Sequence, residues 1–108
     1  MTVAADDTGD LRRYFTGRLP ARLAEIVAAR DAARDAGWAE EPLRTFHRLL
    51  HSLAGAGATF GFPEVSDLAR RLERRVQAAL ETGTPPGEAE AGAWHAALAE
   101  LHQTAGTV

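Results

Sequence analysis

The residue of this sequence best suited to chemistry is His51, which lies in an apolar stretch and is followed by Gly55, Gly57 and Gly61. A neutral imidazole has one unprotonated ring nitrogen, which can attack an electrophile or bind a metal ion. His47 stands four residues earlier, at the spacing that places two side chains on one face of a helix. The residues therefore offer two kinds of chemistry: nucleophilic attack by one ring, or metal binding by the pair.

A predicted helix that begins at Pro42 must hold these residues in place. Its apolar residues recur at steps of three and four, the pattern of a helix with one buried face: Leu43, Phe46, Leu50, Leu53 and Gly57. With about 100° between successive residues, the mean direction of this buried face lies about 130° from His51, so we expect the ring to face solvent. The same geometry places within about 60° of His51 the residues Arg44, His47, Arg48, Gly55 and Ala58.

The glycines after His51 differ in what they predict. Gly57 lies on the buried face, where it lets a neighbouring helix approach, and Gly61 ends the helix before Pro63. Gly55 is predicted to be exposed inside the helix, where a glycine costs about 1 kcal/mol relative to alanine. A partner surface that must approach the backbone beside His51 would account for this cost, and a tolerated surface glycine is the alternative.

The remaining elements are also predicted to be helices, because no stretch alternates apolar with polar residues. We expect a flexible lead-in over residues 1–9, a short helix over 10–17, and a second helix over 20–36 that starts at Pro20. Further helices are expected after Pro63 and after the linker over 82–88, with a frayed tail over 104–108. The predicted fold is all-α, an up-down-up-down antiparallel four-helix bundle over residues 10–103 with a short extra N-terminal helix.

Composition narrows the class of protein. The 108 residues suit one domain, cysteine is absent, and the formal net charge is −3 with arginine as the sole cationic residue type besides histidine. These values exclude disulfides and thiolate metal sites, and they argue against nucleic acid as the main partner. No apolar run approaches the roughly 20 residues that cross a membrane, and the first residues do not resemble a secretory signal. We therefore expect a cytoplasmic protein.

The stretch HSLAGAGATFGF, followed by PEVSDLARRLE, resembles the histidine phosphotransfer (Hpt) domain of multistep two-component signalling. The family pattern is His-x-x-Lys-Gly with a second glycine six residues after the first, and His51, Gly55 and Gly61 stand at the matching positions. The resemblance extends over most of the chain from Leu11 to Leu101. It implies that His51 carries a phosphoryl group between the aspartates of receiver domains. It also implies a carrier without its own nucleotide site or intrinsic cofactor, because the receiver supplies Mg²⁺.

The resemblance also assigns roles to residues around the ring. In the family a glutamine or glutamate on the following helix hydrogen-bonds the histidine, and Glu73 stands at the corresponding distance, although it could instead offset arginines on a solvated face. Ala54 replaces the usual lysine, and Arg44 and Arg48 are the residues that could supply positive charge instead. We expect apolar contacts with a partner from Ala54, Ala58 and Phe62, with arginines at the rim.

Other functions stay open from the sequence alone. His47 and His51 could bind a metal ion, but two histidines without a third ligand make a weak site, and we predict none. A degenerate module could bind a receiver or a kinase as an adaptor without taking phosphate. The chain could also be the phosphoacceptor segment of a larger histidine kinase. The expected partners are receiver domains of response regulators and hybrid histidine kinases, with no nucleic acid and no membrane, and His95 and His102 are expected on the wet surface without a role.

Overall fold

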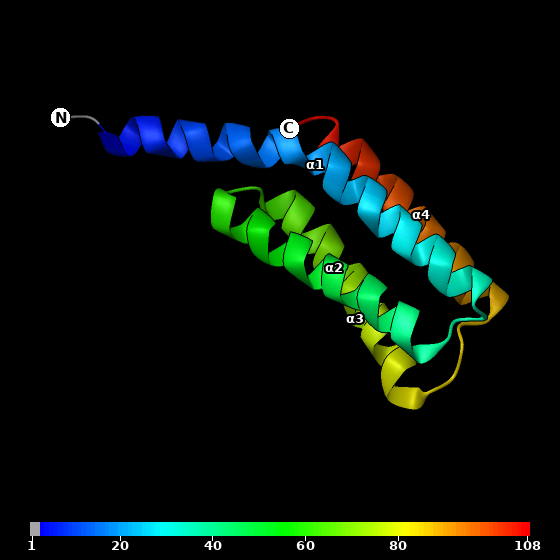
Figure 1. The fold of residues 1–108 in the computed structure, drawn as a ribbon. Helices are drawn as coiled ribbons and strands as arrows, with labels where there is room; N and C mark the ends of the chain where they lie inside the picture. The colour runs from blue at the N-terminus through cyan, green and yellow to red at the C-terminus, as the bar shows by residue number, and fades with distance from the viewer. Residues whose placement is uncertain (1–2) are drawn as a thin grey trace.

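The computed structural model describes residues 3–108, with side chains from residue 9 onward. Over these residues the chain forms four helices: α1 (Val3–Asp35), α2 (Glu40–Phe60), α3 (Pro63–Thr82) and α4 (Glu88–Ala105). Figure 1 shows that each helix returns alongside the helix before it, and α4 closes the bundle against α1 and α3. The predicted all-α helical bundle is confirmed. None of these helices carries an apolar stretch that could span a bilayer, over the part of the chain described.

The predicted short N-terminal helix is wrong, because α1 continues without a break through Gly17 and Pro20. Phe15, Leu19 and Leu23 are all buried at steps of four residues, so one apolar stripe crosses the proline and keeps both parts of the helix on the core. Proline inside a helix removes one backbone hydrogen bond and bends the axis, and Figure 1 shows such a bend in α1.

The predicted boundaries at the two ends also change. Residues 3–9 of the predicted lead-in belong to α1, whereas residues 1–2 lie outside the described part. Figure 1 shows the first turns of α1 extending past the ends of the other helices. At the other end, α4 runs to Ala105, two residues into the predicted tail. Gly106 follows directly as the C-cap of α4, and helix ends carry an uncertainty of one or two residues in any sequence-based prediction.

A tight turn joins α1 to α2. Gly37 and Trp38 both adopt left-handed backbone conformations, with φ of 66° and 63°, and the Trp38 N–H donates to the carbonyl of Ala33 at 2.7 Å. A left-handed conformation is unfavourable for tryptophan, and packing must offset it. The Trp38 ring meets the buried Trp94 ring of α4 edge to face, with centroids 5.4 Å apart. The turn is thereby attached to the core.

Close packing fixes α2 against α3. A Cβ atom on Gly57 would lie 3.1 Å from the backbone nitrogen of Ser66, so the two backbones approach as closely as glycine permits. The Ser66 hydroxyl donates to the carbonyl of Ala54 at 2.7 Å in a buried position. Between the helices, Gly61 has φ of 85° and reverses the chain within two residues. These contacts fix the register between α2 and α3, which decides what faces His51.

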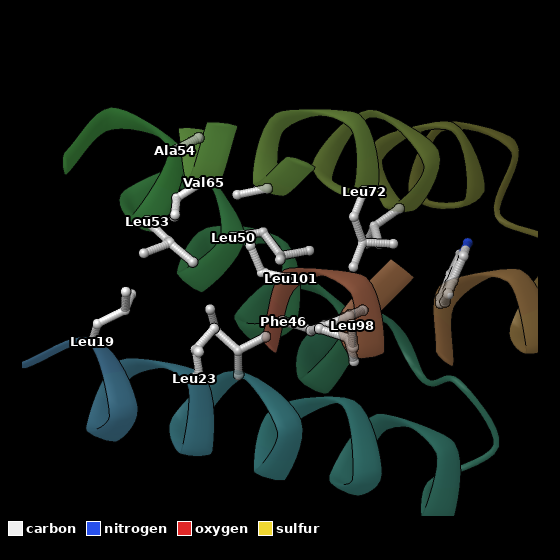
Figure 2. Close-up of a cluster of buried hydrophobic side chains, with 14 of the residues drawn as sticks. Leu19, Leu23, Phe46, Leu50, Leu53, Ala54, Val65, Leu72, Leu98 and Leu101 are labelled. Atoms are coloured by element: carbon white, nitrogen blue, oxygen red, sulfur yellow. The ribbon is translucent and has the colours of Figure 1, made fainter. Parts of the chain in front are cut away.

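The core lies between all four helices, and Figure 2 shows its side chains converging there. The predicted apolar face of α2 is buried throughout: Leu43, Phe46, Leu50, Leu53 and Gly57. The other helices contribute one apolar stripe each. Examples are Leu19 and Leu23 on α1, Val65 and Leu72 on α3, and Leu98 and Leu101 on α4.

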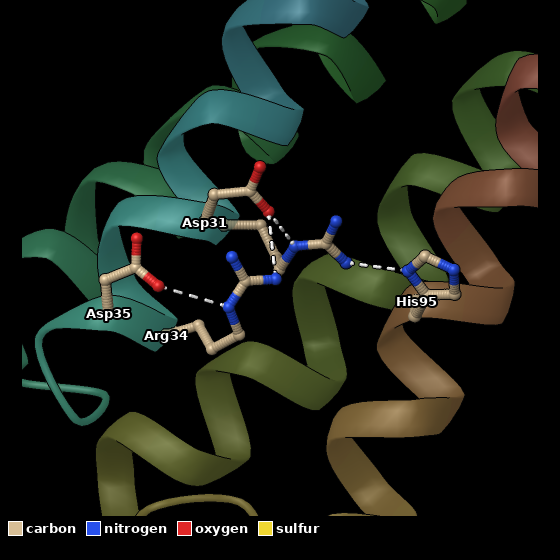
Figure 3. Close-up of polar contacts among 5 residues, drawn as sticks. Asp31, Arg34, Asp35 and His95 are labelled. Carbon is tan, nitrogen blue, oxygen red and sulfur yellow. Dashed lines mark hydrogen bonds and ion pairs between the residues drawn. The ribbon is translucent and has the colours of Figure 1, made fainter.

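A polar cluster joins α1 to α4 at the end of the bundle near the first turn. Figure 3 shows His95 of α4 facing charged residues of α1. The buried Arg30 donates to Nδ1 of His95 at 3.1 Å and to the Asp31 carboxylate at 2.7 Å, and the latter bond lowers the pKa of Asp31. His95 therefore has a structural partner that its sequence context does not indicate. His102 also has one, since its Nδ1 contacts the carbonyl of Leu98 at 2.9 Å.

Candidate functional site

His51 stands in the second half of α2 with its ring in solvent, as its angle from the buried face predicts. The side chain is 69% exposed, whereas Leu50 and Leu53 on either side of it are fully buried. The orientation follows from helix geometry, because each residue turns the side-chain direction by about 100°. A large ligand can reach this ring without any movement of the bundle.

Glu73 of α3 contacts the ring from the side. Its Oε2 atom lies 2.7 Å from Nδ1 of His51, and its side chain is only 13% exposed. An ionised carboxylate only accepts hydrogen bonds, so Nδ1 carries the hydrogen. In a neutral ring this leaves Nε2 unprotonated and free to attack. The alternative that Glu73 only offsets arginines on a solvated face is wrong, since its polar contacts among the described residues are with histidines.

Open space lies beside the ring on the C-terminal side of α2. Gly55 and Ala58 are exposed, and a Cβ atom built on Gly55 would meet nothing within 4 Å. Packing inside the bundle therefore does not require glycine at this position. Clearance for a partner surface therefore stays a prediction, beside the alternative of a tolerated surface glycine.

A model of the Hpt domain family matches residues 10–105. The chain belongs to the Hpt domain family. No curated protein and no solved structure matches the sequence. Membership gives this Hpt domain a histidine phosphotransfer role in two-component signalling, in which such domains interact with receiver domains and histidine kinases. His51 is the histidine of the family pattern, and it is the exposed ring described above.

The two arginines predicted beside His51 of this Hpt domain differ in their contacts. Arg44 is exposed and its Nε donates to Glu40 at 2.9 Å, one turn toward the start of α2. Arg48 is also exposed, and within the part of the chain described it makes no hydrogen bond or ion pair. Glu40 and Arg44 stand four residues apart on one face of α2, the spacing at which oppositely charged side chains meet. Of the two, Arg48 is the one whose guanidinium has no partner among the side chains from residue 9 onward.

Two of the predicted partner contacts of this Hpt domain are wrong. Ala54 is 1% exposed, because it follows Leu50 by four residues and shares its inward direction, and Figure 2 shows it in the core. Phe62 is 6% exposed, because the chain reverses at Gly61 and brings its ring onto Phe15 of α1, with centroids 4.8 Å apart. Neither side chain is available to a partner as the bundle stands.

Metal binding gains no support at the histidine pair. The rings of His47 and His51 are stacked with centroids 6.4 Å apart, and Nδ1 of His51 is taken by Glu73. Among the described residues, no group of three or more histidine, cysteine, aspartate or glutamate side chains is arranged to hold a metal ion.

The sequence places His47 on the exposed face beside His51, as a residue for partner binding and as half of a possible metal-binding pair, and the structure adds a contact inside this Hpt domain. Its side chain is 23% exposed, and its Nε2 lies 3.5 Å from the same Glu73 oxygen that contacts His51. The spacing of four residues between the two histidines was the available signal. Their shared contact with α3 was hidden, because it depends on how α3 is placed against α2.

Proposed function

We propose that this Hpt domain is a phosphoryl carrier, in which Nε2 of His51 accepts the group from an aspartyl phosphate of one receiver domain and gives it to the aspartate of another. The observation that carries the proposal is the combination of an exposed ring and a largely shielded carboxylate, 13% exposed, on its Nδ1. Together they present an unprotonated Nε2 to solvent in a fixed orientation.

In the transfer step, the Nε2 lone pair forms the N–P bond while the P–O bond to the receiver's aspartate breaks. The electron pair of the broken bond returns to that aspartate as a carboxylate, so no separate acid or base is needed for the leaving group. The ring gains positive charge, which Glu73 stabilises by accepting the hydrogen bond from Nδ1–H, with 2.7 Å between Nδ1 and Oε2. Phosphoryl transfer depends mostly on in-line position and charge stabilisation, and a carrier needs little else.

Positive charge for the phosphoryl oxygens must come from arginine or from the partner, because the chain has no lysine and Ala54 stands at the family's lysine position. Arg48 is the arginine of α2 that we propose for this role, by hydrogen bonds from its guanidinium. The receiver would supply the Mg²⁺ and the acidic pocket, so the carrier needs no intrinsic cofactor and no nucleotide site of its own. We propose a cytoplasmic location, beside such partners.

A transfer assay tests the proposal. The protein is incubated with purified receiver domains that carry labelled aspartyl phosphate, and label on the protein is followed over time. We expect acid-labile, base-stable label on the wild type and none on His51→Gln. The matched control is His102→Gln, which changes a histidine of α4 and should take up label at the wild-type rate. Absence of label from several competent receivers would reject the carrier function.

The same assay separates the carrier from an adaptor. If the wild type binds an unphosphorylated receiver but takes no label, the domain is an adaptor, which the loss of the lysine permits. If the domain is a carrier, we also expect Glu73→Ala to slow transfer and to leave helix content unchanged. The substitution removes the hydrogen bond to Nδ1 of His51 but no side chain of the apolar core. An unchanged rate in Glu73→Ala would remove this carboxylate from the mechanism.

A further inference from the structure

His47 and His51 bring their rings to the same oxygen of Glu73. Nδ1 of His51 lies 2.7 Å from Oε2, and Nε2 of His47 lies 3.5 Å from that atom. Among the described residues these two rings are the polar contacts of the carboxylate, whose side chain is 13% exposed. A carboxylate so far removed from water needs donors that replace its lost hydration, and one hydrogen bond leaves acceptor sites unused. His47 is the second donor within reach.

The two histidines are not equivalent in position. The His51 side chain is 69% exposed and the His47 side chain is 23% exposed, so the first faces a partner and the second lies against α3. Their ring planes are 16° apart, as expected for neighbouring turns of one helix. When its Nε2 carries hydrogen, His47 places a polar N–H close to Glu73, with the nitrogen 3.5 Å from Oε2, longer than a usual hydrogen bond, so the attraction is electrostatic. That interaction favours the ionised carboxylate and limits the directions in which it can turn.

We propose that His47 is a positioning residue for the phosphoryl acceptor: it holds the Glu73 carboxylate beside α2, and the carboxylate then keeps His51 protonated at Nδ1. His47 does not itself touch the phosphoryl group. The kinetic consequence rests on the proposed carrier function, whereas the tautomer of His51 depends only on the geometry of the three side chains.

The test compares His47→Leu, which removes the donor, with His47→Gln, whose amide nitrogen can take the place of Nε2. Long-range ¹H–¹⁵N NMR spectra report which nitrogen of His51 carries hydrogen. Uptake of phosphate from phosphoramidate, a small donor that phosphorylates histidine, reports the reactivity of the ring without a receiver. His102→Leu is the control, because it removes a histidine of α4 that contacts the Leu98 carbonyl and not Glu73.

In His47→Leu we expect a lower fraction of His51 in the Nδ1–H tautomer. We also expect phosphate uptake from phosphoramidate to slow about tenfold, the lower end of the effect of removing a partner that orients a functional histidine. His47→Gln should restore most of the tautomer fraction and of the uptake rate, and His102→Leu should match the wild type in both. If His47→Leu does not fold, His47→Asn replaces it, because its shorter amide cannot reach Glu73.

Two results would overturn the proposal. One is a donor-lacking variant whose His51 tautomer and uptake rate equal those of the wild type. The other is His47→Gln behaving like His47→Leu, which would mean that the ring acts by its shape and not by its N–H. If the wild type takes no phosphate from phosphoramidate or from receivers, the carrier function fails, and the NMR comparison still decides whether His47 positions Glu73.

Discussion

Replacing Gly55 should raise stability and lower phosphoryl transfer at the same time. Gly55 lies inside α2 and is exposed, and a Cβ atom there would meet nothing within 4 Å. In an open helical position, alanine is favoured over glycine by about 0.8–1.0 kcal/mol. We expect Gly55→Ala to increase the free energy of unfolding by nearly this amount, and to raise Tm by about 4 °C for a domain of this size. Urea unfolding and calorimetry measure both quantities.

The functional effect should grow with the size of the new side chain. Gly55→Gln keeps good helix propensity but fills the space beside His51, and overpacking a close contact typically costs about 1–3 kcal/mol. Because about 1.4 kcal/mol corresponds to a tenfold change, we expect transfer from a phosphorylated receiver to slow by roughly 5-fold to 140-fold. Uptake from phosphoramidate should change little, since a small donor does not need the cleared surface.

Gly92 of α4 supplies the matched control. It is also exposed inside a helix with nothing within 4 Å of a built Cβ atom, but it lies on α4 rather than beside His51. Gly92→Ala and Gly92→Gln should stabilise the bundle as their Gly55 counterparts do and leave transfer unchanged. If Gly55→Gln transfers phosphate as fast as Gly92→Gln, the space beside His51 is not a docking surface. If Gly55→Ala destabilises the bundle, the description of Gly55 as unconstrained is wrong.

Three further predictions concern stability. Gly57→Ala should lower the free energy of unfolding, measured by urea titration, by about 1–3 kcal/mol. Its Cβ would lie 3.1 Å from the backbone nitrogen of Ser66, which cannot move aside, so an unchanged free energy would contradict the close packing. Arg12→Ala should lower the free energy of unfolding by about 1 kcal/mol in the same titration, because the Arg12 guanidinium donates to two carbonyls at the end of α2, the nearer at 3.1 Å. An unchanged urea midpoint would show that these hydrogen bonds do not contribute to stability. The hydrogen bond from Arg75 lowers the pKa of Glu90 below its ordinary value, so this pair should stabilise the bundle above about pH 4.5 and lose its contribution as pH falls through the lowered pKa. Arg75→Gln should therefore flatten the acid side of the stability profile, and identical profiles would refute the coupling.

The helices and the direction of His51 could be predicted from sequence, because both depend on periodicity along a single helix. Leu43, Phe46, Leu50 and Leu53 define the buried face of α2, and the ring must then point away from it. The same reasoning failed at Pro20, where local helix-breaking preference was outweighed by an apolar stripe that continues on both sides. It also failed for Ala54, whose position four residues after Leu50 already indicated the core.

The contacts between helices were decided by the tertiary structure. Sequence placed Glu73 at a suitable distance along the chain, but its 2.7 Å contact with His51 depends on the register that Gly57, Ser66 and the reversal at Gly61 impose on α2 and α3. The approach of His47 to the same oxygen depends on the same register, and the burial of Phe62 depends on how α1 packs against the turn between α2 and α3. Side-chain direction within one helix repeats with a fixed period and can be read from the chain, whereas the offset between two helices depends on how their surfaces pack and has no local signal.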